Sequence, residues 1–325
     1  MRLKTTVLLI LTSLLLFTSC NKSEFLKGKE SKPKKIAFIS ISRGGQLWGN
    51  IKNGARMAHG ETSCLLDFYS PVEETDAFQQ IEFLKEAGES DFDVIIIDPS
   101  DVTLLAGPIE DLQNKGVKVL QIYNESVAYN GFRQFKLMSN FSPVGEAIGN
   151  FIIDNKSNQA VHVLIVGALL HTSSGSQTEL GIKKMFKDNS DLKFDTIYCF
   201  GDSDKAEELI SAKIKKNETI NFIIALDETS SDGIIKAIDN KSIDTSKIFV
   251  LAWGNTLNNI QGLEDGSIKG IVAINGFGLG YRAIYAAIDL ANGKEVPTTP
   301  LDFSIVTKES FSEERNQRLL FPQIL

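Results

Sequence analysis

Apolar residues fall into two alternating patterns along most of the chain. Short runs rich in Val, Ile and Leu, such as KIAFISIS at 35–42, are typical of strands that are buried on both faces. Most of these runs precede a stretch in which apolar residues recur every three or four positions, the spacing of one face of a helix. Within residues 46–59, for example, Leu47, Ile51 and Ala55 share such a face. The alternation predicts strands that are each followed by an amphipathic helix.

These alternating segments define the expected fold. The predicted strands are 35–42, 64–70, 92–99, 117–123, 160–169, 195–201, 221–227, 247–253 and 270–275. The predicted helices are 46–59, 73–87, 104–115, 143–155, 178–188, 204–215, 231–240, 257–264 and 279–291. Strands of this kind form parallel sheets with helices on both faces. The alternations are too many for one open sheet, so we predict an α/β fold with two doubly wound parallel-sheet domains.

The N-terminus, residues 1–20, has the layout of a secretory signal peptide. Arg2 and Lys4 precede an apolar run at 7–17, and small residues lead into Cys20. The run is too short to span a bilayer as a helix, which needs about 20 residues. A cysteine at this place resembles a bacterial lipoprotein signal, so Cys20 is the predicted lipidation site; a plain secreted or anchored chain is the alternative. The polar, lysine-rich residues 21–34 predict a flexible tether.

Composition narrows the possible partners. Hydrophobic residues make up 42% of the chain and charged residues 23%, as in soluble globular proteins. The net charge of −7, without a basic stripe, argues against nucleic acid as a partner. His59, His162 and His171 lack metal-ligand spacing and no CxxC motif occurs, so we expect no metal site. Cys64 and Cys199 lie in apolar runs typical of buried free thiols, and a bridge between them stays open.

Behind this signal, the order of segments resembles the type I periplasmic binding-protein family of sugar transporters. The resemblance rests on IAFISISRGGQLWGNIKNGARMAHGE, DVIIIDPSDVTLLAGPIEDLQNKGVKVLQIYN, VLIVGALLHTSSGSQTELGIKKMF, FIIALDETSSDGIIKAI, VLAWGNTLNNIQGLEDGSIKGIVAINGFGLGYRAI and LDFSIVTKE. Each piece is a generic α/β segment, and their order behind a lipoprotein signal carries the likeness over residues 35–311.

The resemblance implies a function. It implies a monomeric, lipid-anchored solute-binding protein of the periplasm or cell surface, without a cofactor. The protein would close like a hinge over a small polar ligand, a sugar or a related compound, and deliver it to an ABC permease. The alternative is a sensor of the same fold that presents its open or closed state to a membrane histidine kinase or chemoreceptor.

The resemblance also implies domain boundaries, because the family's chain crosses between its domains three times. The crossings would fall near 138–140, 274–275 and 303–306, and together they form a three-strand hinge. The implied N-terminal α/β domain is 35–138 plus 275–303, and the implied C-terminal α/β domain is 139–274 plus 304–325.

Candidate ligand residues of the N-terminal domain follow its predicted strands, because ligands in such sheets bind beyond the carboxyl ends of the strands. After the first strand, glycines let the backbone approach a ligand, and the resemblance gives Gln46 and Trp48 polar and aromatic contacts. A core position is the alternative for Trp48, and Arg43 would suit an anionic group. Asp98 is a hydrogen-bond acceptor or a helix cap. After the next strand, Tyr123 and Asn124 are predicted contacts, and they complete the set for this domain.

Candidates of the C-terminal domain depart from the family pattern. Many sugar binders carry an arginine near Ser176, where this chain has none. Asp227 follows Leu226 where the family often has Asn-Asp, and the Trp253-Gly-Asn255 stretch lacks the family's frequent aspartate. Asn275, at the second crossing, is a further predicted contact. Because of these departures, a less polar, phosphorylated or signal-type ligand remains an alternative to a monosaccharide.

Catalysis is the third class of function considered. The sequence contains no Ser-His-Asp order, metal cluster or glycine-rich nucleotide loop. Asp98 and Asp227 are a conceivable acid–base pair, but facing carboxylates also occur in plain sugar binders. We therefore expect a binding protein and not an enzyme.

Overall fold

A computed structural model describes residues 32–73, 76–125, 135–137, 140–156, 160–186 and 192–322. The predicted signal peptide, Cys20 and most of the predicted tether lie outside these residues. Residues 34–325 form one unit by their contacts, and everything below concerns the described part of that unit.

The structure contains two sheets. The strands are β1 (Lys35–Ile39), β2 (Leu65–Tyr69), β3 (Val94–Ile97), β4 (Lys118–Gln121), β5 (Phe135–Lys136), β6 (Val161–Gly167), β7 (Leu192–Tyr198), β8 (Phe222–Ala225), β9 (Phe249–Trp253), β10 (Gly270–Ile274) and β11 (Phe303–Val306). The first sheet has the order β2-β1-β3-β4-β5 and is parallel throughout. The second has the order β11-β10-β9-β8-β6-β7, and only β11 runs antiparallel to its neighbour.

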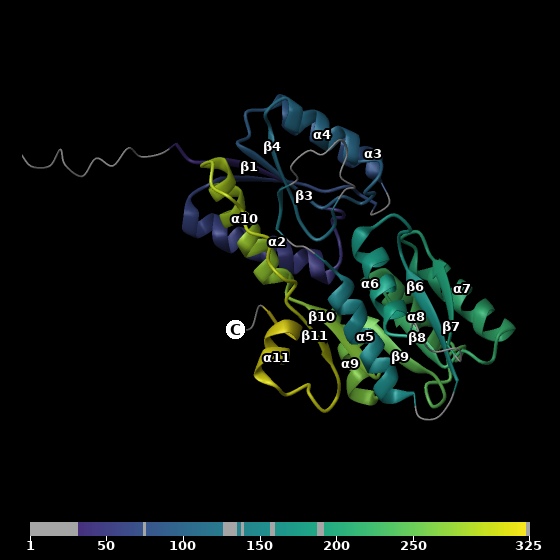
Figure 1. The fold of residues 1–325 in the computed structure, drawn as a ribbon. Coiled ribbons are helices and arrows are strands. Elements are labelled where there is room, and N and C mark those ends of the chain that lie inside the picture. Colours follow the sequence, from purple (N-terminus) through teal and green to yellow (C-terminus); the bar gives the residue numbers. More distant parts are fainter. Residues whose placement is uncertain are drawn as a thin grey trace, which may run out of the picture. The chain divides into compact units, whose positions relative to one another are not determined.

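Helices connect these strands, as Figure 1 shows. They are α2 (Gln46–Thr62), α3 (Ala77–Glu89), α4 (Ala106–Asn114), α5 (Ser142–Asn155), α6 (Ser173–Lys184), α7 (Ser203–Lys216), α8 (Glu228–Asp239), α9 (Leu257–Asp265), α10 (Gly276–Ala291) and α11 (Glu314–Leu320). We use "first lobe" for the first sheet with α2, α3, α4 and α10, and "second lobe" for the second sheet with the other helices.

Alternation along the strands explains why the first sheet is covered on both faces. In β1, Ile36 and Phe38 belong to the cluster that includes the apolar residues of α2 and α10. Ala37 and Ile39 point to the opposite face, where they pack with residues of α3 and α4. Successive side chains of a strand point to opposite faces of the sheet, so the residues of one short strand contribute to both hydrophobic clusters.

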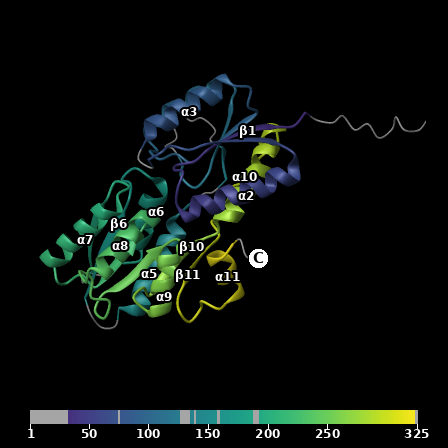
Figure 2. The same cartoon turned by 180° about the vertical axis from the view of Figure 1, so that it is seen from behind.

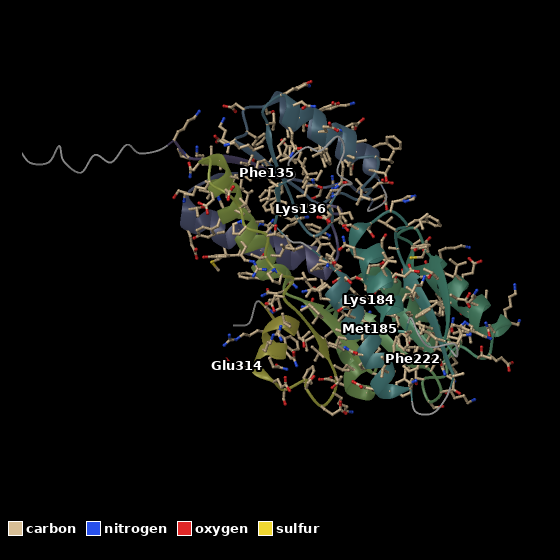
Figure 3. The ribbon with its side chains drawn as sticks, viewed as in Figure 1. Phe135, Lys136, Lys184, Met185, Phe222 and Glu314 are labelled. Carbon is tan, nitrogen blue, oxygen red and sulfur yellow. The ribbon has the colours of Figure 1, made fainter. Side chains whose placement is uncertain are left out.

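The second lobe is built in the same way. Helix α5 packs against α6, and α7 packs against α8, as the view from behind in Figure 2 also shows. Phe222 of β8 stacks on Phe249 of β9 with ring centroids 5.2 Å apart, and Figure 3 shows its position among these strands. No helix in the described residues is both long and apolar enough to cross a membrane.

The predicted fold class is confirmed, since both sheets are mostly parallel and are covered by helices. The short strand β5 is an addition, because its Phe135-Lys136 sequence carries no apolar run. Helix α6 begins at Ser173 and not near residue 178, because Thr172 accepts a hydrogen bond from Gly175 N and caps an earlier start. The domain boundaries stay predictions, and Met138 and Ser139 of the first crossing lie outside the described residues.

The crossing of α2 and α10 depends on residues without a side chain. A Cβ at Gly54 would lie 1.9 Å from the Phe277 carbonyl oxygen, and one at Gly280 would lie 1.8 Å from the Ile51 carbonyl oxygen. Backbone atoms cannot move aside as a flexible side chain can, so the two helices touch backbone to backbone here.

Replacing Gly54 by Ala should therefore destabilise the protein, by about 1–3 kcal/mol or more, because the added methyl overpacks this crossing. The matched control is Gly60→Ala in the same helix, where the new Cβ meets nothing within 4 Å. There the higher helix propensity of Ala should leave the stability unchanged or slightly raised. Urea unfolding of both variants measures the difference; equal stability would show that α2 and α10 do not cross this closely.

Candidate functional site

A cavity of about 360 Å³ lies where the carboxyl ends of strands from both sheets meet. Asp98 follows β3, Tyr123 follows β4, Ala168 follows β6, Leu226 follows β8, and Trp253 ends β9. The first turns of α2, α6 and α8 complete the wall. In α/β sheets, ligands bind beyond the carboxyl ends of the strands. This cavity is therefore the candidate binding site.

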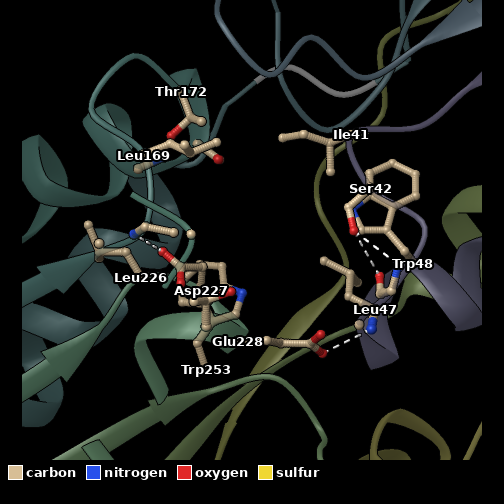
Figure 4. A pocket seen from close by; sticks show the side chains of 18 of the residues that line it. Ile41, Ser42, Leu47, Trp48, Leu169, Thr172, Leu226, Asp227, Glu228 and Trp253 are labelled. Carbon is tan, nitrogen blue, oxygen red and sulfur yellow. Dashed lines mark hydrogen bonds between the residues drawn. The ribbon is translucent and has the colours of Figure 1, made fainter. Parts of the chain in front are cut away.

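Aromatic side chains stand on both sides of the cavity. Trp48 comes from α2 of the first lobe and Trp253 from β9 of the second, and they are the two tryptophans of the sequence. Both are buried, with exposed fractions of 5% and 2%. Figure 4 shows them on opposite sides of the open space. Trp48 also packs with the core, so the same side chain belongs to the cavity wall and to the core cluster.

Tyr123 adds a third aromatic ring, held in an unusual backbone conformation. Its φ angle of 58° lies in the left-handed region that few non-glycine residues adopt. Its ring meets Phe141 edge-on, with centroids 4.8 Å apart. Burial and the nearby Asp98 carboxylate raise the pKa of the Tyr123 hydroxyl well above its ordinary value, so this group stays a neutral donor.

Buried hydrogen bonds fix the loops of the first lobe. The Gln80 amide nitrogen donates to the carbonyl oxygens of Ser40 and Asp98, at 2.9 and 2.8 Å, and its oxygen accepts from Ser100 N at 2.9 Å. Asp98 Oδ1 then accepts from Asn124 N at 2.9 Å. The strand ends at β1, β3 and β4 are thereby held in one arrangement.

Asp227 does the same for the second lobe. It caps α8 by accepting from Ser230 N and Ser230 Oγ, both at 2.7 Å, and it accepts from Ala168 N at 2.5 Å. The carboxylate therefore joins the ends of β6 and β8. Burial raises the pKa of Asp227, while the hydrogen bonds from Ser230 and Ala168 oppose the shift.

Glu228, the next residue, reaches across the cavity to the other lobe. Its Oε2 accepts from Gln46 N at 2.8 Å and its Oε1 from Leu47 N at 2.9 Å, as Figure 4 shows for part of this contact. Helix α2 has no side-chain cap of its own, because its N-cap residue is Gly45. Burial raises the pKa of Glu228 to about 7, and the two backbone hydrogen bonds oppose that rise.

A second contact crosses in the opposite direction. Asn124 Oδ1, on the first lobe, accepts from Ser174 N at the start of α6, at 2.9 Å. The neighbouring Glu125 N donates to Ser173 Oγ at 2.9 Å. Each lobe thus satisfies free N–H groups at the first turn of a helix on the other lobe.

Most of the predicted ligand residues line the cavity: Gln46, Trp48, Asp98, Tyr123, Asn124, Asp227 and Trp253. The others are not among its lining residues and form hydrogen bonds elsewhere. Arg43 Nε donates to Ser70 O, and Ser176 Oγ donates to Thr172 O. Asn255 Nδ2 donates to Leu320 O, and Asn275 caps α10 and donates to Asp302.

Sequence reasoning missed Glu228 as a site residue. Acidic residues are common in the first turn of a helix because they interact favourably with the helix dipole. Nothing in the local sequence pattern therefore distinguished Glu228. Its role depends on α2, which lies far away in the sequence. The signal available was the Asp-Glu pair directly after the FIIAL strand. Asp232, one turn further along α8, also lines the cavity and was not predicted.

Comparisons with known proteins place this chain in a family. A family model described as a periplasmic binding protein domain matches residues 36–295, and the chain belongs to that family. This membership confirms the resemblance seen in the sequence. A comparison with curated proteins gives no significant match.

Solved structures share the fold. An ABC transporter solute-binding protein from Agrobacterium vitis bound with α-D-tagatopyranose is 18% identical, with a TM-score of 0.80 over 88% of this chain and 99% of that one. A carbohydrate transporter solute-binding protein from Agrobacterium radiobacter in complex with D-arabinose is 20% identical, with a TM-score of 0.81 over 89% and 99%. A second Agrobacterium vitis protein, with bound D-fucose, is 18% identical, with a TM-score of 0.82 over 88% and 100%.

The raised pKa of Glu228 predicts a pH dependence of stability. A carboxyl group whose pKa rises on folding stabilises the protein below its unfolded pKa, and this contribution is lost as the pH rises through about 7. From pH 5 to pH 8, the melting temperature of the wild type should fall by about 2 °C or more relative to Glu228→Gln. Differential scanning calorimetry measures both. The control is Glu208→Gln, at an exposed ion pair; an equal pH trend in all three proteins would contradict the assignment.

Proposed function

We propose that this chain is an extracytoplasmic solute-binding protein that takes a small, hydroxyl-rich, sugar-like ligand into the cavity between its lobes. The single observation that carries the proposal is the cavity itself, with aromatic and polar side chains converging on it from both sheets. Its volume of about 360 Å³ is in the range of small-molecule sites, which begin at about 300 Å³.

The chemistry of the wall supports a polyhydroxylated ligand. The flat faces of Trp48, Trp253 and Tyr123 suit the C–H face of a sugar ring. Carboxylates such as Asp98 and Asp227 accept hydrogen bonds from hydroxyl groups, and hydroxyl and amide side chains both donate and accept. These groups are held by the buried hydrogen bonds described above, so little ordering remains to be done on binding.

Closure of the two lobes over the ligand completes the proposed mechanism. The contacts of Glu228 with Gln46 N and Leu47 N, and of Asn124 with Ser174 N, join the lobes beside the cavity. A ligand that touches both walls binds the joined arrangement more tightly than a separated one, so it shifts the equilibrium towards closure. The closed form is what an ABC permease would receive.

Relatives and the N-terminal sequence support this setting. The structurally similar proteins named above are transporter solute-binding proteins with a bound monosaccharide. The lipoprotein-like signal ending at Cys20 would anchor the protein to a membrane on the extracytoplasmic side, in the periplasm or at the cell surface. The crossings between the lobes proposed from the family pattern would act as the hinge.

Replacing Trp48 by Ala should weaken sugar binding about tenfold or more, a loss of about 1.4 kcal/mol, because the aromatic face is removed. The ligand is chosen as the member of a monosaccharide panel that raises the melting temperature most. Isothermal titration calorimetry then gives its affinity for the wild type, Trp48→Ala and Trp48→Phe, of which the last keeps a ring and should lose only a few-fold.

The control for this experiment is Phe78→Ala, an exposed aromatic residue outside the cavity. It should bind as the wild type does. The proposal is overturned if no sugar of the panel binds, or if a properly folded Trp48→Ala protein keeps the wild-type affinity.

A further inference from the structure

Among the described residues, the charged side chains that line the cavity all have the same sign. They are Glu73, Asp98, Asp227, Glu228 and Asp232, and the described part of the lining contains no Lys, Arg or His. In a low-dielectric cavity, a group of carboxylates creates a strong negative potential that favours a positive ligand.

Nearby basic side chains on the first lobe are engaged elsewhere. Arg43 Nε donates to Ser70 O at 3.2 Å, and Lys52 Nζ contacts the carbonyl oxygens of Ser42 and Arg43 at 3.5 and 3.3 Å. Burial, followed by repulsion from Arg56 and Arg43, lowers the pKa of Lys52. Neither side chain lines the cavity.

At the start of α8, Asp227 and Glu228 accept hydrogen bonds from neutral donors, and Asp232 lies within reach of the charge of Lys236. Asp227 accepts from Ala168 N and from Ser230, and Glu228 accepts from two backbone N–H groups. Lys236, one turn beyond Asp232, bonds to Ser203 Oγ at 2.7 Å and to Asp204 Oδ1 at 2.5 Å. The donors seen at Asp227 and Glu228 carry no full positive charge.

These three carboxyl groups also act on one another. Burial comes first in raising the pKa of Glu228, and repulsion from Asp232 and Asp227 adds to it. Burial and then Asp232 raise the pKa of Asp227, and burial raises that of Asp232 against the opposing charge of Lys236. A positive group placed among them would relieve this repulsion.

An anionic ligand is disfavoured by the same geometry. The N-terminus of a helix such as α2 is a natural place for a phosphate or carboxylate, because its first N–H groups have no partner within the helix. Glu228 fills that place with its own carboxylate. An anion entering the cavity would meet this charge and those of Asp227 and Asp232.

The cation that fits is organic. No group of three His, Cys, Asp or Glu side chains in the described residues could hold a metal ion. Trp48, Trp253 and Tyr123 instead offer aromatic faces, which attract an ammonium group and also cover the hydrocarbon part of a ligand. Aromatic faces beside carboxylates are typical of sites for amines.

We propose that the ligand carries a protonated amine beside its hydroxyl groups, as an amino sugar does, and that Asp227, Glu228 and Asp232 receive the ammonium group. This inference rests on the proposed function and names the class of ligand for the same cavity. It also assigns Glu228 a second role, as the residue that excludes anions from the α2 N-terminus.

Matched ligands test the charge requirement directly. The full chain is titrated at pH 7.5 with D-glucose and D-glucosamine, with D-galactose and D-galactosamine, and with the corresponding N-acetylated sugars and uronates. In at least one pair the amine should bind about tenfold or more tightly than the hydroxyl partner. The N-acetylated form, which has lost the charge, should lose that advantage, and the uronates should bind least.

Variants then test which carboxylates receive the ammonium group of the ligand. In Asp232→Asn, the affinity ratio of amine to hydroxyl partner should fall about fivefold, because one of the carboxylates that receive the ammonium group is lost. The control is Asp244→Asn, an exposed residue after α8 and outside the cavity, which should keep the wild-type ratio. An unchanged ratio in both Asp232→Asn and Glu228→Gln would overturn the assignment of these carboxylates.

The outcomes separate the two proposals. If the neutral sugars bind as tightly as their amines in every pair, or the uronates bind best, the inference fails and the proposed function stands. If no compound of any kind binds, both fail. Tighter binding of an amine, lost in its N-acetylated form, supports both.

Discussion

Free N–H groups at helix N-termini, each satisfied by a side chain from the opposite lobe, are the constraint on which the site depends. Glu228 provides the carboxylate for α2, and Asn124 provides the amide oxygen for α6. Both pairs lie in the wall of the cavity, so the contacts that join the lobes also set the distance between the aromatic and acidic groups. These bonds join the lobes at the cavity wall.

The same constraint links stability to selectivity. A carboxylate at the N-terminus of α2 interacts favourably with the helix, but its burial as a charge is unfavourable. The pKa of Glu228 is raised, so burial is the larger of the two effects. Because this carboxylate occupies the place where an anion would otherwise bind, the helix end no longer favours negative ligands. In the proposed account, the acidic wall, the aromatic side chains and the capped helix all favour a neutral or positive ligand over an anion.

The sequence was sufficient for the fold and for much of the cavity. Periodicity located the strands, and a polar residue directly after a strand end, such as Asp98 or Asp227, had to lie where the parallel strands end. The sequence was not sufficient for contacts between distant helices. Glu228 meets α2 only because the lobes face each other, and Asn255 donates to Leu320 O near the C-terminus rather than lining the cavity. Such pairings depend on how the sheets are placed, which no local pattern encodes.

The central claim is that a ligand binds between Trp48 and Trp253. Because these are the only tryptophans in the sequence, protein labelled with 5-fluorotryptophan should give two ¹⁹F NMR resonances, assigned with the Trp48→Phe variant. Titration with the tightest-binding sugar or amino sugar should shift both resonances together, with one dissociation constant, since the rings lie on opposite sides of one cavity. Saturable binding that leaves both resonances unmoved would place the ligand elsewhere and contradict the account.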